Sequence, residues 1–295
     1  MKALVISGGG SKGAFAGGVA EYLIKEKKKD YGIYIGTSTG SLMVTHLAIG
    51  KVKELKEIYS NVDQRTIFNI CPFHIKRHNG HVAVGINHFN TIRNFLRGSK
   101  TFGESKNLKA MIDRNIKDAY LKQVVKTDKK LLVTVSNITL NQVEFKDLRE
   151  HSFDDFRDYI WASSNLIPFM SLMVKNNYEY ADGGFANLVP IREAIRQGAT
   201  EIDAIILETE VTQLNRMPSK NPFSLITNLF DYMQSHIERH NISIGKLEAE
   251  HRHVKLNLYY TPTVLTTNSL VFDKEKMRKW WRDGFEYAKQ KEKMN

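Results

Sequence analysis

The sequence predicts an α/β protein: a three-layer sandwich in which helices cover both faces of a mainly parallel central sheet. Short apolar runs alternate with amphipathic helical stretches along most of the chain, which is typical of parallel strands joined by helical crossovers. Twice near the N-terminus, a buried-type strand opens through glycines directly into a helix. A chain of 295 residues is long enough to bury a core of this kind.

The expected strands are short runs rich in Val, Ile, Leu and Tyr, bounded by turn residues. In chain order they cover 2–7, 31–35, 131–136, 143–145, 178–181, 202–207 and 251–259. Helices are expected where apolar residues recur every three or four positions, over 14–27, 41–48, 51–59, 108–121, 159–165, 191–197, 221–250 and 274–293. The strands 131–136 and 143–145 are close in the sequence and are predicted to form an antiparallel part of the sheet. The stretch 68–95 is predicted to be irregular.

We expect one catalytic core over residues 1–210, followed by a helical extension over 211–295 that packs on the same domain. Within the core, residues 60–105 are a candidate cap insertion over the active-site cleft, because long irregular stretches are uncommon in compact domains. In the extension, the helix over 221–250 carries an apolar stripe that faces either the core or, as a lid, lipid. The stripe consists of Phe223, Ile226, Leu229, Phe230, Met233 and Ile237.

Gly36-Thr37-Ser38-Thr39-Gly40 lies between an apolar strand and a helix, the setting in which Gly-x-Ser-x-Gly forms a nucleophile elbow. A turn this tight forces strained backbone angles on Ser38, and Gly36 and Gly40 remove the Cβ atoms that would clash. The Ser38 hydroxyl is then exposed at a helix N-terminus, where the dipole favours developing negative charge. An ordinary capped turn would carry the same residue types, so this motif needs support from the rest of the chain.

The first strand opens into Gly8-Gly9-Gly10-Ser11-Lys12-Gly13, which fits the Gly-x-Gly-x-x-Gly pattern of dinucleotide-binding proteins. Those proteins need an acidic residue at the end of the second strand, where it binds the ribose hydroxyls. Here the second strand ends in Ile35-Gly36-Thr37-Ser38, without a carboxylate. The sequence therefore favours the other use of such a loop, an oxyanion hole made of backbone N–H groups.

The net charge of +11 favours an anionic partner, either a phospholipid surface or nucleic acid. The chain has no zinc-finger spacing or RNA-binding signature, so we expect no nucleic-acid partner. The basic C-terminal helix, with adjacent Trp280 and Trp281, is expected to dock on the domain with one indole packed inward and the other at a surface; contact of this helix with a membrane is the alternative. The single cysteine, Cys71, excludes an internal disulfide framework. Without a signal-peptide pattern, we expect a cytoplasmic protein that contacts membranes peripherally.

Histidines gather at two places that need to be weighed as metal sites. The first group, scattered through the irregular stretch without a paired ligand motif, consists of Cys71, His74, His78 and His81. In the second, His236 and His240 lie one helical turn apart but lack the glutamate position of zinc proteases. We therefore expect no metal, and no organic cofactor either.

The two glycine-rich motifs, this close together near the N-terminus, resemble those of the patatin-like phospholipase family. Two later segments agree: 161–168 resembles the family's Ala-Ser-x-x-x-Pro segment, and Asp182-Gly183-Gly184 with the following 187–190 resembles its Asp-Gly-Gly and Asn-x-Pro motifs. The resemblance extends over about residues 1–210. Lys12 stands where arginine is more usual and Leu188 where a second asparagine is frequent; lysine keeps the charge but loses the guanidinium fork.

This resemblance implies a patatin-like fold and a lipid acyl hydrolase of the phospholipase A type, acting on phospholipids or related acyl esters. It also implies a catalytic dyad in which Ser38 is the nucleophile and Asp182 acts on it directly as the base. An ordinary aspartate, with a pKa of about 3.9, is a weak base, so Asp182 is expected to be desolvated. Gly183 and Gly184 would form the turn that presents it.

Alternative functions remain open at this point. The same dyad would serve a general carboxylesterase or an acyltransferase, and a non-catalytic membrane adaptor would keep the fold without turnover. The chain order also permits a Ser-Asp-His triad of the α/β-hydrolase kind. Its candidate bases are His236, His240, His251 and His253.

Overall fold

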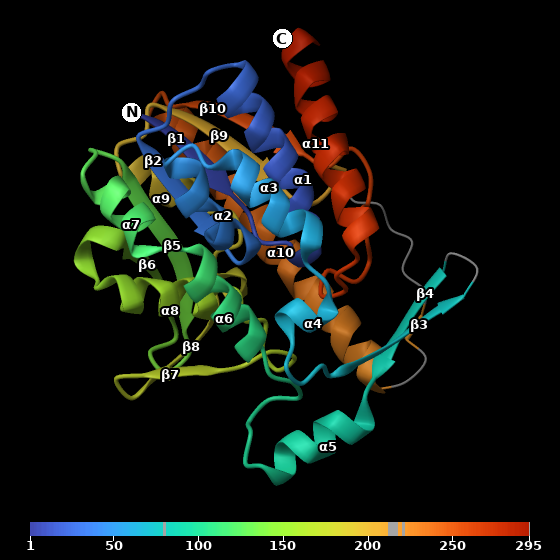
Figure 1. Cartoon of the computed structure of the whole chain (residues 1–295). Helices are drawn as coiled ribbons and strands as arrows, with labels where there is room; N and C mark the ends of the chain where they lie inside the picture. The colour runs from blue at the N-terminus through green and yellow to red at the C-terminus, as the bar shows by residue number, and fades with distance from the viewer. Residues whose placement is uncertain (79–80, 212–217, 220–221, 295) are drawn as a thin grey trace.

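The computed structural model describes residues 1–294 except 79–80, 212–217 and 220–221 (Figure 1). Its centre is an eight-stranded sheet with the order β10-β9-β1-β2-β5-β8-β7, in which β6 also pairs with β5. The strands of this sheet are β1 (Lys2–Ile6), β2 (Ile33–Thr37), β5 (Lys130–Asn137), β6 (Gln142–Asp147), β7 (Met173–Lys175), β8 (Tyr178–Asp182), β9 (Glu201–Ile206) and β10 (Lys255–Tyr260). Two further strands, β3 (Phe73–His78) and β4 (His81–Ile86), form a separate antiparallel hairpin.

The pairing changes from parallel to antiparallel at β5. Strands β10, β9, β1, β2 and β5 are parallel, whereas β6 and β8 run antiparallel to β5. This arrangement confirms the prediction of a mainly parallel sheet with an antiparallel part. Because Ile6 of β1 pairs with Gly36 of β2, the loops that follow these two strands leave the same edge of the sheet. That edge carries both glycine-rich motifs.

Helices cover both faces of the sheet (Figure 1). They are α1 (Gly13–Glu21), α2 (Thr39–Ala48), α3 (Val52–Asn61), α4 (Gln64–Ile67), α5 (His88–Leu96), α6 (Lys106–Asn115), α7 (Asp118–Val125), α8 (Phe153–Ser163), α9 (Ile191–Arg196), α10 (Pro222–His251) and α11 (Lys274–Met294). Successive residues of β1 face opposite layers: Leu4 joins the core beneath α1, α2 and α11, whereas Val5 joins the core beneath α9 and α10. The predicted three-layer sandwich is therefore confirmed.

Three local predictions differ from the structure. The stretch predicted to be irregular contains the β3–β4 hairpin and α5. The single helix expected over 108–121 is broken at Ile116, whose buried side chain packs in the core and whose carbonyl accepts a hydrogen bond from Arg157. The last strand begins at Lys255 because α10 continues to His251 and the left-handed backbone of His253 (φ 55°) then ends it.

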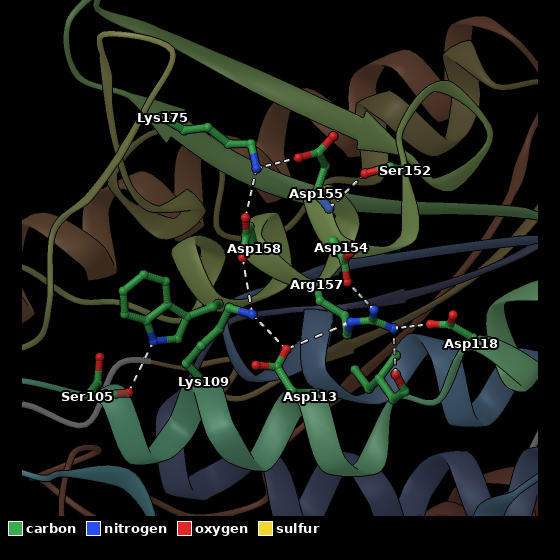
Figure 2. A network of polar contacts seen from close by, with 12 residues as sticks. Ser105, Lys109, Asp113, Asp118, Ser152, Asp154, Asp155, Arg157, Asp158 and Lys175 are labelled. Carbon is green, nitrogen blue, oxygen red and sulfur yellow. Dashed lines mark hydrogen bonds and ion pairs between the residues drawn. The ribbon is translucent and has the colours of Figure 1, made fainter.

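Helix α8 is fixed to its surroundings by a network of ion pairs, shown in Figure 2. Arg157 bonds Asp118 of α7 at 2.7 Å, and Lys109 of α6 bonds Asp158 at 3.1 Å. Each exposed pair contributes little alone, but the pairs join α8 to two other helices at several points. The indole of Trp161 adds a hydrogen bond to the carbonyl of Ser105, at 3.1 Å. The C-terminal end of α8, which reaches the active-site edge, is thereby held in place.

The chain beyond residue 210 completes the sheet as well as adding helices. Strand β10 pairs with β9, and α11 packs against α1 (Figure 1). The C-terminal helix is docked as expected, but Trp280 and Trp281 are both buried, at 6% and 1% exposure, so the expectation that one indole lies at a surface was wrong. The contact is close because α1 carries glycines: a Cβ at Gly18 would lie 1.9 Å from the carbonyl oxygen of Trp281.

Replacing Gly18 with alanine should therefore loosen the docking of α11. We expect Gly18→Ala to lower the free energy of unfolding by about 1–3 kcal/mol, since backbone cannot move aside as a flexible side chain can. Urea denaturation measures this difference. Gly85→Ala is the matched control, because a Cβ at Gly85 would meet no atom within 4 Å. Equal stability of both variants and wild type would contradict the close contact.

Candidate active site

Ser38 lies between β2 and α2 with a left-handed backbone, φ 54° and ψ −121°. A non-glycine residue in such a conformation is strained by about 1–3 kcal/mol. The two glycines of the motif make the turn sterically possible. A Cβ at Gly36 would lie 2.3 Å from the carbonyl carbon of Gly40, and a Cβ at Gly40 would lie 2.3 Å from the oxygen of Ile6. The turn thus has the geometry predicted for residues 36–40.

Hydroxyl groups from another part of the chain hold this turn. The N–H of Ser38 donates to Oγ of Ser163 at 3.0 Å, and its carbonyl accepts from Oγ of Ser164 at 3.1 Å and from Oγ of Ser41 at 2.6 Å. All three serines are buried. Ser163 and Ser164 belong to segment 161–168, which the sequence singled out as a motif without indicating what it does. The segment was singled out by its resemblance to the Ala-Ser-x-x-x-Pro pattern, which includes Ser163 but not a role for it.

Asp182 ends β8 and is 3% exposed. Its carboxyl group accepts a hydrogen bond from the N–H of Gly184 at 2.8 Å, and hydrogen bonding by the Ser38 side chain lowers its pKa. The N–H of Asp182 donates to the carbonyl of Asn165 at 3.0 Å, so segment 161–168 contacts both Ser38 and Asp182. Burial raises the pKa of Asp182 to about 7, although the two hydrogen bonds lower it. Asp182 can therefore exchange a proton near neutral pH.

Most N–H groups of the loop 8–13 already have partners. The bonded donors are Gly8 to Leu188, Ser11 to Ser269, Lys12 to Gly9, and Gly13 to the carbonyls of Gly10 and Ser11. Within the part of the chain that the structure describes, the N–H groups of Gly9 and Gly10 have no partner. The loop lies against Ser38, because a Cβ at Gly8 would be 3.1 Å from the Cβ of Ser38. Gly9 and Gly10 are thus the loop residues with donors free to bind a ligand.

A partly buried charge cluster includes Lys12 of this loop. Lys12, with 8% of its side chain exposed, forms an ion pair with Glu208, which follows β9. Glu238 of α10 is 4% exposed, and its Oε2 has no hydrogen-bond partner among the described residues. Burial and then the negative charge of Glu208 raise the pKa of Glu238 to about 8, while Lys12 and Arg239 lower it. Glu238 is therefore mostly protonated at neutral pH, which avoids a second negative charge beside Glu208.

The other candidates from the sequence are not part of this arrangement. In the described ranges, no histidine makes a hydrogen bond to Ser38 or Asp182, and His236 and His240 instead contact each other along α10. Those ranges also hold no group of three or more His, Cys, Asp or Glu side chains that could bind a metal ion. Among the helices described, none has both the length and the hydrophobicity to cross a bilayer.

Comparison with known protein families identifies the family of this chain. Residues 4–195 match the family model described as patatin-like phospholipase. The chain belongs to the patatin-like phospholipase family. Membership supports, at the level of the family, a hydrolase that acts on lipid acyl esters.

Two individual proteins are similar to this chain. One is the uncharacterized protein L620 of Acanthamoeba polyphaga mimivirus. The two sequences are 26% identical over an alignment of 297 positions, which covers 86% of this chain and 78% of that protein. The other is the crystal structure of VipD from Legionella pneumophila, with a TM-score of 0.54 and 14% identity, covering 98% of this chain. This chain spans 66% of the VipD chain, just under two thirds. The likeness to VipD shows a shared fold.

The buried Glu238 predicts that stability depends on pH. In the folded protein Glu238 keeps its proton up to about pH 8, whereas an unfolded glutamate loses it near pH 4.5. The folded state therefore binds more protons between these values, and stability falls as pH rises through this window. Glutamine has no proton to lose, so Glu238→Gln should raise the free energy of unfolding at pH 8 by about 1–3 kcal/mol, and by less at pH 5.

Urea denaturation at the two pH values measures this effect. Glu250→Gln is the control, since Glu250 is exposed on the same helix. If both glutamine variants change stability equally, or if the Glu238 variant gains nothing at pH 8, Glu238 is not a buried neutral acid.

Proposed function

We propose that this protein is a lipid acyl hydrolase of the phospholipase A type that cleaves acyl esters through a dyad of Ser38 and Asp182. The observation that carries the proposal is the pairing of a serine on a strained strand-to-helix turn with a buried carboxyl group, Asp182, whose pKa is about 7 and is lowered by the Ser38 side chain. Such a carboxylate is a much stronger base than an exposed aspartate and is still partly deprotonated at neutral pH. Membership of the family supports lipid esters as substrates.

In the first half of the proposed reaction, Oγ of Ser38 attacks the ester carbonyl carbon while its proton passes to the Asp182 carboxylate. The carbonyl oxygen becomes negative, and the free N–H groups of Gly9 and Gly10 are the donors proposed to stabilise it. Donors of this kind contribute about 3–4 kcal/mol each in other serine hydrolases. Protonated Asp182 then donates to the leaving alcohol, which leaves an acyl-enzyme.

In the second half, water takes the place of the alcohol. Asp182 accepts a proton from water, which attacks the acyl carbon, and then returns the proton to Oγ of Ser38 as the fatty acid leaves. Aromatic side chains next to the dyad give an acyl chain an apolar environment. Phe185 follows Gly184 directly, and its ring lies 6.0 Å from that of Phe230, which in turn is 5.6 Å from the ring of Phe169.

A covalent probe tests the nucleophile. A fluorophosphonate should label the wild-type protein at a single serine, because only a serine with a base and an oxyanion site reacts at a useful rate. Ser38→Ala should not be labelled, whereas Ser136→Ala, which removes a serine buried in β5, should be labelled like the wild type. Peptide mapping by mass spectrometry locates the label. Unchanged labelling of the Ser38 variant would refute the assignment.

The base gives a second test, through pH. Because Asp182 must be deprotonated to accept the serine proton, kcat/KM for a water-soluble ester should rise as pH increases through about 7 and then level off. Asp182→Asn keeps the shape but cannot accept the proton, so it should reduce kcat by at least about 10³-fold.

Gln replacements at His236, His240, His251 and His253 should each leave kcat within about tenfold. A loss of 10³-fold at one of these histidines, in folded protein, would identify a triad instead.

A further inference from the structure

Helix α5 presents its apolar side chains to solvent. Phe89, Ile92 and Leu96 lie along one face and are 74%, 58% and 83% exposed. The buried positions of the same helix are polar: Thr91 and Asn94 are 6% and 0% exposed, and Asn94 donates to the carbonyl of Thr101 at 2.8 Å. A soluble helix has the opposite arrangement, with its apolar face inward. The exposed face of α5 therefore needs a partner.

The first half of α10 has an exposed apolar face as well. Leu225, Leu229 and Tyr232 are 59%, 53% and 59% exposed. On the other side of the helix, Phe230 packs against Phe169 and Phe185. The apolar stripe expected from the sequence is thus divided: Phe230 and Ile237 pack inward, whereas Ile226, Leu229 and Met233 are substantially exposed, and the side chain of Phe223 lies outside those described.

These two faces lie at the end of the molecule that carries the active site. In Figure 1, α5, the β3–β4 hairpin and the N-terminal end of α10 lie at the lower end, beyond the edge where β1 and β2 end. The hairpin connects them, since it leads directly into α5 and α10 packs against β4. We call the exposed apolar side chains here the docking face. It consists of Phe89, Ile92, Phe95 and Leu96 of α5 and Leu225, Ile226, Leu229, Tyr232 and Met233 of α10.

The segment that contains the hairpin and α5 is strongly positive. Residues 64–103 contain no Asp or Glu, and their six cationic residues are Arg65, Lys76, Arg77, Arg93, Arg97 and Lys100. This short stretch therefore accounts for more than half of the net charge of +11. Arg93 and Arg97 lie one turn apart on α5, are exposed, and form no ion pair with any residue that the structure describes.

We propose that the docking face binds the surface of an anionic phospholipid bilayer. Apolar side chains that insert between lipids, flanked by arginines that meet anionic headgroups, are the two features that such binding requires. A second copy of the chain fits less well, because a symmetric contact through this face would bring the arginines of two α5 helices together. The inference rests on the proposed function in one respect: it places the Ser38 site where lipid esters are found.

Vesicle co-sedimentation tests the proposal. The wild-type protein should bind vesicles of equal parts phosphatidylglycerol and phosphatidylcholine more strongly than pure phosphatidylcholine vesicles, and less strongly as salt rises. Ile92→Ser with Leu96→Ser, and separately Arg93→Gln with Arg97→Gln, should each weaken binding at least about tenfold. The control is Ile244→Ser with Leu247→Ser, at 47% and 67% exposure on the second half of α10, and it should bind like the wild type.

Two further measurements separate the outcomes. Light scattering should find the same mass for the wild type and the α5 variants; a wild-type dimer that dissociates in these variants, with vesicle binding unchanged, would assign the face to a second copy. Vesicle binding that is equal in all variants would overturn the proposal.

Hydrolysis of a water-soluble ester should be unaffected by the α5 changes. If the wild type binds vesicles through this face but hydrolyses no ester, the proposed function fails while the docking face stands.

Discussion

The backbone of Ser38 is held in a left-handed conformation by hydrogen bonds from residues more than 120 positions away in the sequence. Locally, only the carbonyl of Ser38 is held, by Ser41, and this leaves the N–H of Ser38 without a partner within the turn. The hydroxyl groups of Ser163 and Ser164 bind the N–H and the carbonyl of Ser38, and they are themselves fixed because α8 is joined to α6 and α7 by ion pairs. The position of Ser38, the proposed nucleophile, thus depends on packing between helices outside the site.

Two buried carboxyl groups near this edge of the sheet have raised pKa values, and their surroundings give them different roles. Asp182 faces a hydroxyl group, so the proton it exchanges can take part in chemistry. Glu238 lies near the ion pair of Lys12 and Glu208. Because Glu238 stays protonated, it adds no further negative charge beside Glu208.

Much of this organisation could be predicted from the sequence, since it depends on local patterns. The three layers follow from the alternation of strands and helices, and Ser38 was identified by glycines at fixed spacing. Asp182 was identified only through a family resemblance, because an Asp-Gly-Gly turn has no chemical signature of its own. Glu238 was not found, because a glutamate on an amphipathic helix is ordinarily exposed. The outward apolar face of α5 was not found, because the stretch 68–95 was predicted to be irregular. The fate of Trp280 and Trp281 was misjudged because the receiving glycines, Gly17 and Gly18, lie at the other end of the chain.

The strand order also determines when the protein can assemble during synthesis. Strand β1 pairs with β2 about 30 residues later and with β9 about 200 residues later, and β9 in turn needs β10. Contacts between such distant segments form slowly, because the entropy cost of closing a long loop comes before the contacts can stabilise it. Ser38 leaves the ribosome early, yet the strand that brings Asp182 to it follows only after a further 140 residues. A partly synthesised chain therefore lacks the assembled pair, and a lipid-cleaving centre would form only once most of the chain has emerged.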